Sequence, residues 1–295
     1  MSEVEFGLAI VATINAAIRF SVPITLGALC GLLNERSGIV NIGIEGMMLM
    51  SAFTGFMANV FLSRPEIDPA LQAGPVRLTL ALAVALLTGA AMGLLHGILS
   101  IQYKVDQIIS GTVLNILALG LTGYFYLREA PTLGKLPNLI NNPWPRSDSI
   151  ELSLADNLTF YLPHDIGRIL FDKDLITYLS FLLVFVIGWA LFNTTWGLRT
   201  RSIGENPRAA DTLGIDVYRL QYTNLMLGGM LAGLAGAFLT LAAVGLFEQG
   251  MTTGRGFIAL AVMIFGNWKP SGALKGSLLF GFAMALQNQL QLFGI

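Results

Sequence analysis

The chain has 295 residues, of which 54% are hydrophobic and only 12% are charged, and its formal net charge is −1. A soluble domain carries about 25% charged residues, so this composition excludes an ordinary soluble protein. The nearly balanced charge gives no reason to expect a nucleic-acid partner. Apolar segments close to the roughly 20 residues that cross a bilayer recur along the chain. We therefore predict an all-α, polytopic transmembrane helical bundle that forms a single domain over residues 1–295.

The residues that usually carry enzyme chemistry are sparse. The single cysteine, Cys30, excludes an internal disulfide, and its apolar surroundings are typical of a buried structural thiol. His96 and His164 are far apart in sequence and form no metal-ligand motif. The chain also has no Gly-x-x-x-x-Gly-Lys-Ser/Thr phosphate loop. We expect no catalytic residues, no metal and no bound ATP in this chain.

The first apolar stretch, residues 6–33, is long for one span and contains Arg19 and Pro23. It is either one continuous segment or an interfacial segment followed by a span. Arg19 either reaches the outer lipid headgroups through its aliphatic stem or has a buried functional role. The first five residues contain Glu3 and Glu5 and no basic residue.

Residues 34–46, NERSGIVNIGIEG, interrupt the apolar pattern with charges and three glycines. Non-helical backbone at membrane depth occurs only where protein or water satisfies it. A broken helix here would place Asn41 and Glu45 near a translocation path. The alternative is a simple cytoplasmic turn, with Glu45 favoured by the dipole at the start of the next helix.

Three further spans are predicted at residues 47–62, 78–101 and 108–127. The second is rich in glycine and alanine, which lets helices approach closely in lipid. His96, near its end, is expected to be a hydrogen-bonded histidine rather than a proton relay. Asn115 lies inside the third segment, where contact between helices is the default role and substrate contact is the alternative.

The second half contains segments of unequal length. The proline-containing residues 128–174 are expected to form an irregular outer loop, and residues 175–194 and 223–245 to form spans. Residues 256–265 are too few for an ordinary span and predict a short or broken helix that ends in a cytoplasmic turn. Residues 273–293 complete about eight membrane segments. Glycine-rich interruptions at 38–46 and 250–256, one in each half, point to a central substrate site.

A polar segment, residues 197–218, separates two of these spans and contains a short helix with both ends marked. Asn206 is a helix N-cap, Pro207 fits the first helical position, and Gly214 fits a left-handed C-terminal cap. The helix is only about 10 Å long, too short to cross a membrane. It is either a docking element for another protein or an ordinary connection.

Small and apolar side chains and arginines characterise this segment. Ala209, Ala210, Leu213 and Ile215 could fill a groove on a partner, so Ala210→Arg is expected to abolish that association in a folded protein. Excess basic charge marks the segment as cytoplasmic by the positive-inside rule. Counting single spans back from it places the N-terminus outside. The basic residues are Arg199, Arg201, Arg208 and Arg219.

Four stretches resemble permease subunits of ABC importers, in the branch that handles branched-chain amino acids, simple sugars and nucleosides. They are residues 203–215 (IGENPRAADTLGI), 29–50 (LCGLLNERSGIVNIGIEGMMLM), 105–115 (VDQIISGTVLN) and 254–270 (GRGFIALAVMIFGNWKP). The second stretch closely resembles nucleoside-type permeases, which favours the path-lining interpretation of Asn41 and Glu45. Similar permeases usually carry a further hydrophobic segment, so the chain is expected to be short at its C-terminus.

The resemblance implies a cytoplasmic coupling helix that docks into a cleft on an ATP-hydrolysing subunit. The residues implied in this coupling are Arg201, Gly204, Glu205, Asn206, Pro207, Ala209, Ala210, Leu213, Gly214 and Ile215. A nucleoside needs aromatic stacking or amide hydrogen bonds along its path. The candidates for the path are Asn41, Glu45, Phe53, Phe56 and Asn115.

The resemblance also implies the partners. ATP and Mg²⁺ are expected on a separate ATPase, a related second permease chain is expected to pair with this one, and an extracytoplasmic lipoprotein or periplasmic binding protein is expected to deliver solute in a bacterial plasma membrane. The nucleoside assignment rests on resemblance alone, and a simple sugar is the alternative. A secondary transporter or channel would keep more acidic groups within its spans, and a membrane-embedded enzyme would cluster His, Asp or Glu there.

Overall fold

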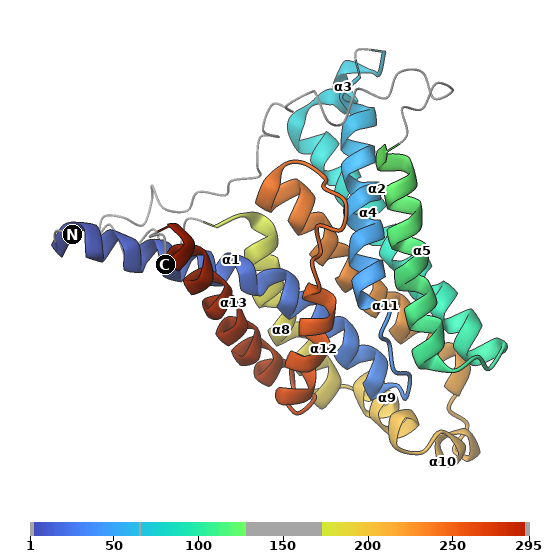
Figure 1. The fold of residues 1–295 in the computed structure, drawn as a ribbon. Helices are drawn as coiled ribbons and strands as arrows, with labels where there is room; N and C mark the ends of the chain where they lie inside the picture. The colour runs from blue at the N-terminus through green and yellow to red at the C-terminus, as the bar shows by residue number, and fades with distance from the viewer. Residues whose placement is uncertain (1–2, 65, 128–172, 293–295) are drawn as a thin grey trace.

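The computed structural model describes residues 3–64, 66–127 and 173–292, and the regular structure in these ranges is helical (Figure 1). Six of the described helices are long and apolar enough to cross a membrane. The elements are α1 (Glu3–Arg36), α2 (Ile44–Leu62), α3 (Pro69–Gln72), α4 (Gly74–Gly97), η1 (Ile98–Gln102), α5 (Gln107–Leu127), α8 (Leu175–Asn193), α9 (Thr195–Glu205), α10 (Pro207–Thr212), α11 (Val217–Ala237), η2 (Phe238–Val244), α12 (Arg255–Phe265) and α13 (Pro270–Leu292).

Several helices begin where the sequence supplies an acceptor for free backbone amides. The Asp106 carboxylate accepts from the Ile108 and Ile109 amides at 2.9 and 3.1 Å, at the start of α5. The Asp216 carboxylate accepts from the Arg219 amide at 3.0 Å, at the start of α11. Polar residues between apolar runs therefore fix the helix boundaries.

In Figure 1 the short helices α3 and α10 lie at opposite ends of the molecule. The loop between η2 and α12 lies in the half that carries α3. The opposite end holds the α1–α2 junction, η1, α9, α10 and the α12–α13 turn. The long helix α1 runs between the two ends and packs against α11, α12 and α13.

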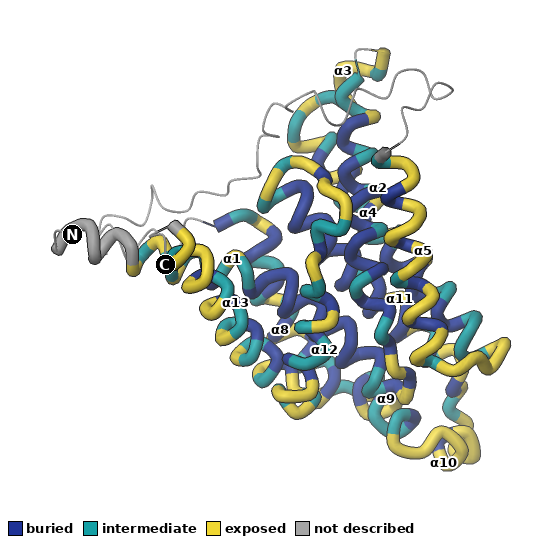
Figure 2. The backbone as a smooth tube through the Cα atoms, in the orientation of Figure 1, coloured by how far each residue is buried: buried dark blue, intermediate teal, exposed yellow. Residues whose placement is uncertain are grey.

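The buried residues are concentrated where these helices pack against one another (Figure 2). The tightest contact joins α4 and α11, where backbones touch through glycine. A Cβ added at Gly229 would lie 2.1 Å from the carbonyl oxygen of Gly89, and one added at Gly93 would lie 2.3 Å from that of Leu225. The close approach of helices predicted for the glycine-rich residues 78–101 is confirmed, because the backbones of α4 and α11 touch there.

The eight predicted membrane segments each correspond to a described helix, and the all-α class is confirmed. Residues 6–33 lie in a single helix that continues through Pro23 to Arg36, so the alternative of a separate interfacial segment does not hold. The predicted short helix at residues 256–265 is α12, which ends in a turn at residues 266–269. The expected outer loop at 128–174 lies almost wholly outside the described residues.

We predict that Gly229→Ala lowers the thermal stability of the purified protein in detergent. The added methyl group meets the Gly89 carbonyl, so α4 and α11 must separate, at a cost of about 1–3 kcal/mol for an overpacked contact. Tryptophan fluorescence during heating measures the midpoint. Gly120→Ala on α5 is the control, because nothing lies within 4 Å of its added Cβ. An unchanged midpoint for Gly229→Ala would show that the contact is looser than described.

Candidate functional site: a coupling helix joined to two helix breaks

The predicted short helix is present as α10, and both of its caps are formed. The Asn206 side chain accepts from the Ala209 amide at 3.1 Å, and Pro207 occupies the first turn. At the other end Gly214 is left-handed, with φ of 76°. The Gly214 amide donates to Asp211 at 2.9 Å and the Ile215 amide donates to Ala210 at 3.2 Å. This pair of bonds is a Schellman motif, which terminates the helix.

Exposure differs among the small and apolar residues expected to fill a partner's groove. Leu213 is 81% exposed, and Ala209 is exposed beside it. Ala210 is only 2% exposed, because it packs against Ile203 and Val217 of its own chain. This burial corrects the expected contact surface: Ala210 holds α10 onto the protein, and Ala210→Arg would disturb folding as well as docking.

The helix before α10 touches the end of α1 directly. A Cβ added at Gly204 of α9 would lie 2.4 Å from the Arg36 carbonyl oxygen, so the two backbones are in contact there. On the other side of this contact, Gly38 has φ of 84°, and a Cβ added to it would lie 3.4 Å from the Gly204 Cα. Gly204 is therefore required by space and Gly38 by its backbone conformation. α9 therefore touches the end of α1, where the α1–α2 junction begins.

Residues 35–38 at the end of α1 also bind α11 and the α12–α13 turn. The Gln221 amide group donates to the Ser37 carbonyl at 3.2 Å. The Arg36 guanidinium donates to the Trp268 carbonyl at 3.0 Å, and the Trp268 indole donates to the Glu35 carboxylate at 2.5 Å. Sequence reasoning missed Trp268 and Gln221 as members of this junction. The polar run Gly-Asn-Trp-Lys-Pro predicted a turn, but it did not predict that this turn binds the end of α1.

The next residues of the junction reach α4 and α5. The Val40 amide donates to the Gln107 side-chain oxygen at 2.8 Å. The two ring nitrogens of buried His96 lie 3.0 Å from the Ser110 hydroxyl and 3.1 Å from the Val40 carbonyl. Both polar atoms of the imidazole have a partner, so His96 has the structural role that the sequence favoured.

The break between α1 and α2 is closed by two asparagines. The Asn41 side-chain oxygen accepts from the Gly43 amide at 2.9 Å, and Asn41 is fully buried. The Asn115 side chain, from α5, accepts from the Gly46 amide at 2.7 Å and donates to the Ile42 carbonyl at 3.1 Å. These bonds satisfy backbone groups that the broken helix leaves free. Asn115 thus joins α5 to the start of α2, which is the contact between helices that the sequence favoured.

Glu45 connects the two glycine-rich interruptions of the chain. Its carboxylate oxygens accept from the Gly254 amide at 2.8 Å and from the Gly256 amide at 2.6 Å, at the start of α12. A carboxylate at a helix N-terminus is favoured by the free amides and by the helix dipole. A Cβ added at Gly256 would lie 2.6 Å from Glu45, so glycine is required at the contact. The first turn of α2 is thus fastened to the first turn of α12.

Phe53 and Phe56 lie about two and three turns beyond Glu45 along α2, inside an aromatic cluster. Their rings lie 5.1 and 6.4 Å from the ring of Phe247, which belongs to the loop before α12. Phe53 is 8% and Phe56 3% exposed. The structure therefore brings the five path candidates to α2 and its immediate neighbours, with Asn41, Phe53 and Phe56 buried in this conformation. Contact of any of the five with solute stays a prediction.

We predict that Asn115→Leu destabilises the protein by roughly 2–4 kcal/mol. The change leaves the Gly46 amide and the Ile42 carbonyl without partners, and each buried orphan costs about 1–3 kcal/mol. Denaturant titration in mixed micelles measures the loss. Thr112→Val on the same helix is the control, because the Thr112 hydroxyl bonds only within α5 and is exposed. Equal stability of the two variants would contradict the proposed role of Asn115.

Comparison with known proteins agrees with these features. Residues 13–293 match the model of the family described as branched-chain amino acid transport system / permease component. The chain belongs to this family. It is the permease subunit of an ABC importer and a multi-pass membrane protein, and it is not itself an enzyme. No solved structure matched the chain.

Three relatives with assigned names span most of the chain. It is 35% identical to the guanosine ABC transporter permease protein NupQ of Bacillus subtilis, over 92% of this chain and 81% of the relative. It is 36% identical to the nucleoside ABC transporter permease protein NupC of Lactococcus lactis, over 90% and 79%. It is 29% identical to a second Bacillus subtilis protein, the guanosine ABC transporter permease protein NupP, over 91% and 71%.

Proposed function

We propose that the chain imports nucleosides, with purine nucleosides such as guanosine as the first substrates to test. Similarity to permeases named for guanosine and nucleosides, along most of the chain, carries this proposal. The chain is proposed to act in a bacterial plasma membrane with a separate ATPase that binds ATP and Mg²⁺. A binding protein outside the membrane delivers the solute.

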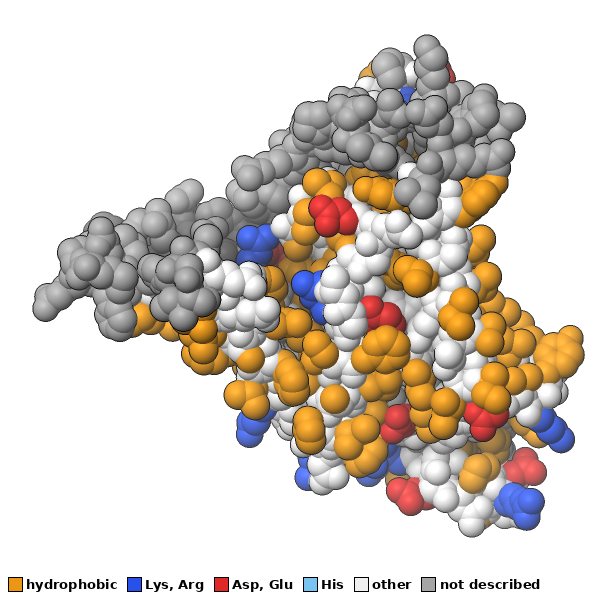
Figure 3. Space-filling model, in the orientation of Figure 1, with side chains coloured by type: hydrophobic (Ala, Val, Ile, Leu, Met, Phe, Trp, Pro, Cys, Tyr) orange, Lys and Arg blue, Asp and Glu red, His pale blue; other side chains and the backbone are white. Residues whose placement is uncertain are grey.

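A second, related permease chain is the proposed partner within the membrane. Two similar but distinct relatives, NupQ and NupP of Bacillus subtilis, carry the same guanosine assignment, which supports a pair of different chains. On the face that carries α12, acidic and basic side chains lie among hydrophobic ones between the two ends of the molecule (Figure 3). Charges at this depth are costly against lipid and favour a water-filled path or a protein partner.

Charge supports an orientation with α10 in the cytoplasm. The end that carries α10 holds Arg36, Lys104, Arg199, Arg201, Arg208, Arg219 and Lys269, whereas the described connection at the α3 end holds Arg64 and Arg77. Excess basic charge marks the cytoplasmic side. We therefore propose that the N-terminus lies outside.

The contacts of α9 and α10 give a physical route for coupling. Closure of the ATPases moves α10, and α9 moves with it because Asn206 joins the two helices directly. Gly204 then presses on Arg36, at the junction that holds α11, α4, α5 and the α12–α13 turn. From there the Glu45 bonds reach the start of α12. The proposed result is alternate opening of the path at its two ends.

Substrate identity is tested with the complete transporter in proteoliposomes. We expect guanosine, supplied with the binding protein, to stimulate ATP hydrolysis and to accumulate inside vesicles in an ATP-dependent manner. Glucose is the comparison solute. Stimulation by glucose and not by guanosine would replace the nucleoside assignment with a sugar, and uptake without an ATPase would refute the importer mechanism in this chain.

For docking, we predict that Leu213→Arg weakens association with the ATPase at least tenfold in micelles. Leu213 is 81% exposed on α10, where a large apolar side chain can fill a cleft, and a charge there must be desolvated on binding. Leu71→Arg is the matched control, because Leu71 is 39% exposed on α3 at the opposite end. Retention of the ATPase by Leu213→Arg would exclude α10 as the docking element.

A further inference from the structure

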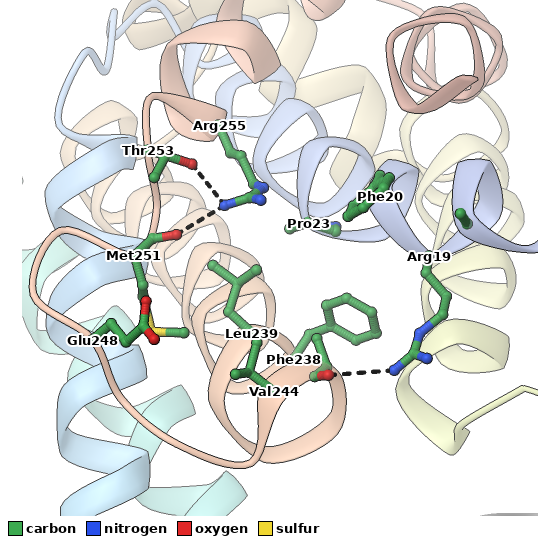
Figure 4. Close-up of a pocket in the computed structure, with 12 residues that line it drawn as sticks. Arg19, Phe20, Pro23, Phe238, Leu239, Val244, Glu248, Met251, Thr253 and Arg255 are labelled. Atoms are coloured by element: carbon green, nitrogen blue, oxygen red, sulfur yellow. Dashed lines mark hydrogen bonds between the residues drawn. The ribbon is translucent and has the colours of Figure 1, made fainter. Parts of the chain in front are cut away.

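A pocket of about 450 Å³ lies between α1, η2, the loop that follows η2 and the start of α12. Figure 4 shows side chains from all four elements around one central space. The volume lies within the range of roughly 300–1,000 Å³ that is usual for small-molecule sites. None of the five path candidates predicted from the sequence is among its lining residues.

The pocket is apolar over most of its wall but carries three charged side chains. Phe20 and Pro23 of α1 face Leu239 and Val244 of η2 across it. The charged residues are Arg19, Glu248 and Arg255. Two guanidiniums and one carboxylate give a donor-rich site with a hydrophobic floor. A lipid chain offers no hydrogen-bond partner to any of the three charged side chains.

Arg19 has capacity to bind a ligand. Its guanidinium reaches the Ala242 and Ala243 carbonyls only at 3.3 and 3.5 Å, longer than the 2.7–3.2 Å of ordinary N–H···O bonds. Both contacts use one of its nitrogens, and the side chain is exposed. A guanidinium carries five N–H donors, so most of them remain for a solute. One expectation from the sequence was that Arg19 only reaches the outer lipid headgroups. That role does not explain why Arg19 lies in the wall of a pocket.

Arg255 is held more firmly at the opposite wall. One of its terminal nitrogens donates to the Met251 carbonyl at 2.8 Å and to the Thr253 hydroxyl at 2.8 Å. Its Nε is buried and has no hydrogen-bond partner among the described residues. The Gly254 and Gly256 amides on either side bind Glu45, and the carboxylate attracts the guanidinium. Glu45 is thus a positioning residue for this wall.

We propose that this pocket is the outer solute-binding site of the permease and that Arg19 reads the hydrogen-bond acceptors of a purine base. The inference rests on the proposed nucleoside function. An arginine fork matches the adjacent O6 and N7 acceptors of guanine, which is its commonest specific contact with a base. The flat ring lies against Phe20 and Pro23. Glu248, across the pocket, accepts from ribose hydroxyls. Release toward the cytoplasm follows when the Glu45 bonds move the start of α12.

The test compares two nucleosides in the reconstituted transporter with its ATPase and binding protein. Guanosine has the O6 acceptor, and purine riboside lacks it. For Arg19→Gln we expect the guanosine concentration that half-maximally stimulates ATP hydrolysis to rise at least tenfold. The value for purine riboside should change less than threefold. Arg64→Gln removes a positive charge outside the pocket, and should leave both values unchanged.

The outcomes separate the inference from the function on which it rests. An equal rise for both nucleosides would mean that Arg19 supports structure or general electrostatics, and would overturn base recognition. Unchanged values for both would exclude the pocket as a solute site while leaving nucleoside import intact. Failure of wild-type protein to respond to either nucleoside would instead refute the proposed substrate.

Discussion

Backbone groups that leave a helix at membrane depth must find partners inside the protein, and the rest of this fold depends on how its two breaks are satisfied. At the α1–α2 break the partners are Asn41 and Asn115, which cap the start of α2 from both sides. At the start of α12 the partner is the carboxylate of Glu45. Glu45 belongs to the first turn of α2. The α1–α2 break therefore supplies the acceptor for the free amides at the start of α12. A shift of the start of α2 relative to the start of α12 would break these bonds.

This arrangement connects the α10 end of the molecule with the pocket beside η2. Residues 35–40, at the end of α1 and just after it, bond to α4, α5, α11 and the α12–α13 turn, and Gly204 of α9 meets the Arg36 carbonyl. The same segment leads into α2, where Glu45 binds the backbone amides on either side of Arg255. The proposed coupling route therefore runs from α10 to the wall of the pocket through hydrogen bonds and glycine contacts.

The sequence predicted those structural features that depend only on residues close together in the chain. The caps at Asn206 and Gly214, the shortness of α12 and the glycine faces of α4 and α11 follow from capping, length and side-chain size. Burial could not be predicted in the same way: Ala210 looks identical to Ala209 in sequence, but one faces Ile203 and the other faces solvent. The Glu45 contact joins residues more than 200 positions apart, and the pocket around Arg19 depends on the path of the loop after η2. Spacing within one segment carries no information on such contacts.

The central claim is that motion at the coupling helix reaches the outer end of the molecule. The most direct measurement is the distance between spin labels at Ile14→Cys on α1 and Leu246→Cys in the loop after η2, in the assembled transporter. The only native cysteine, Cys30, is buried, so labelling is selective. The account predicts that binding of ATP and Mg²⁺ to the ATPase shifts this distance distribution. An unchanged distribution in a complex that hydrolyses ATP and transports solute would contradict it.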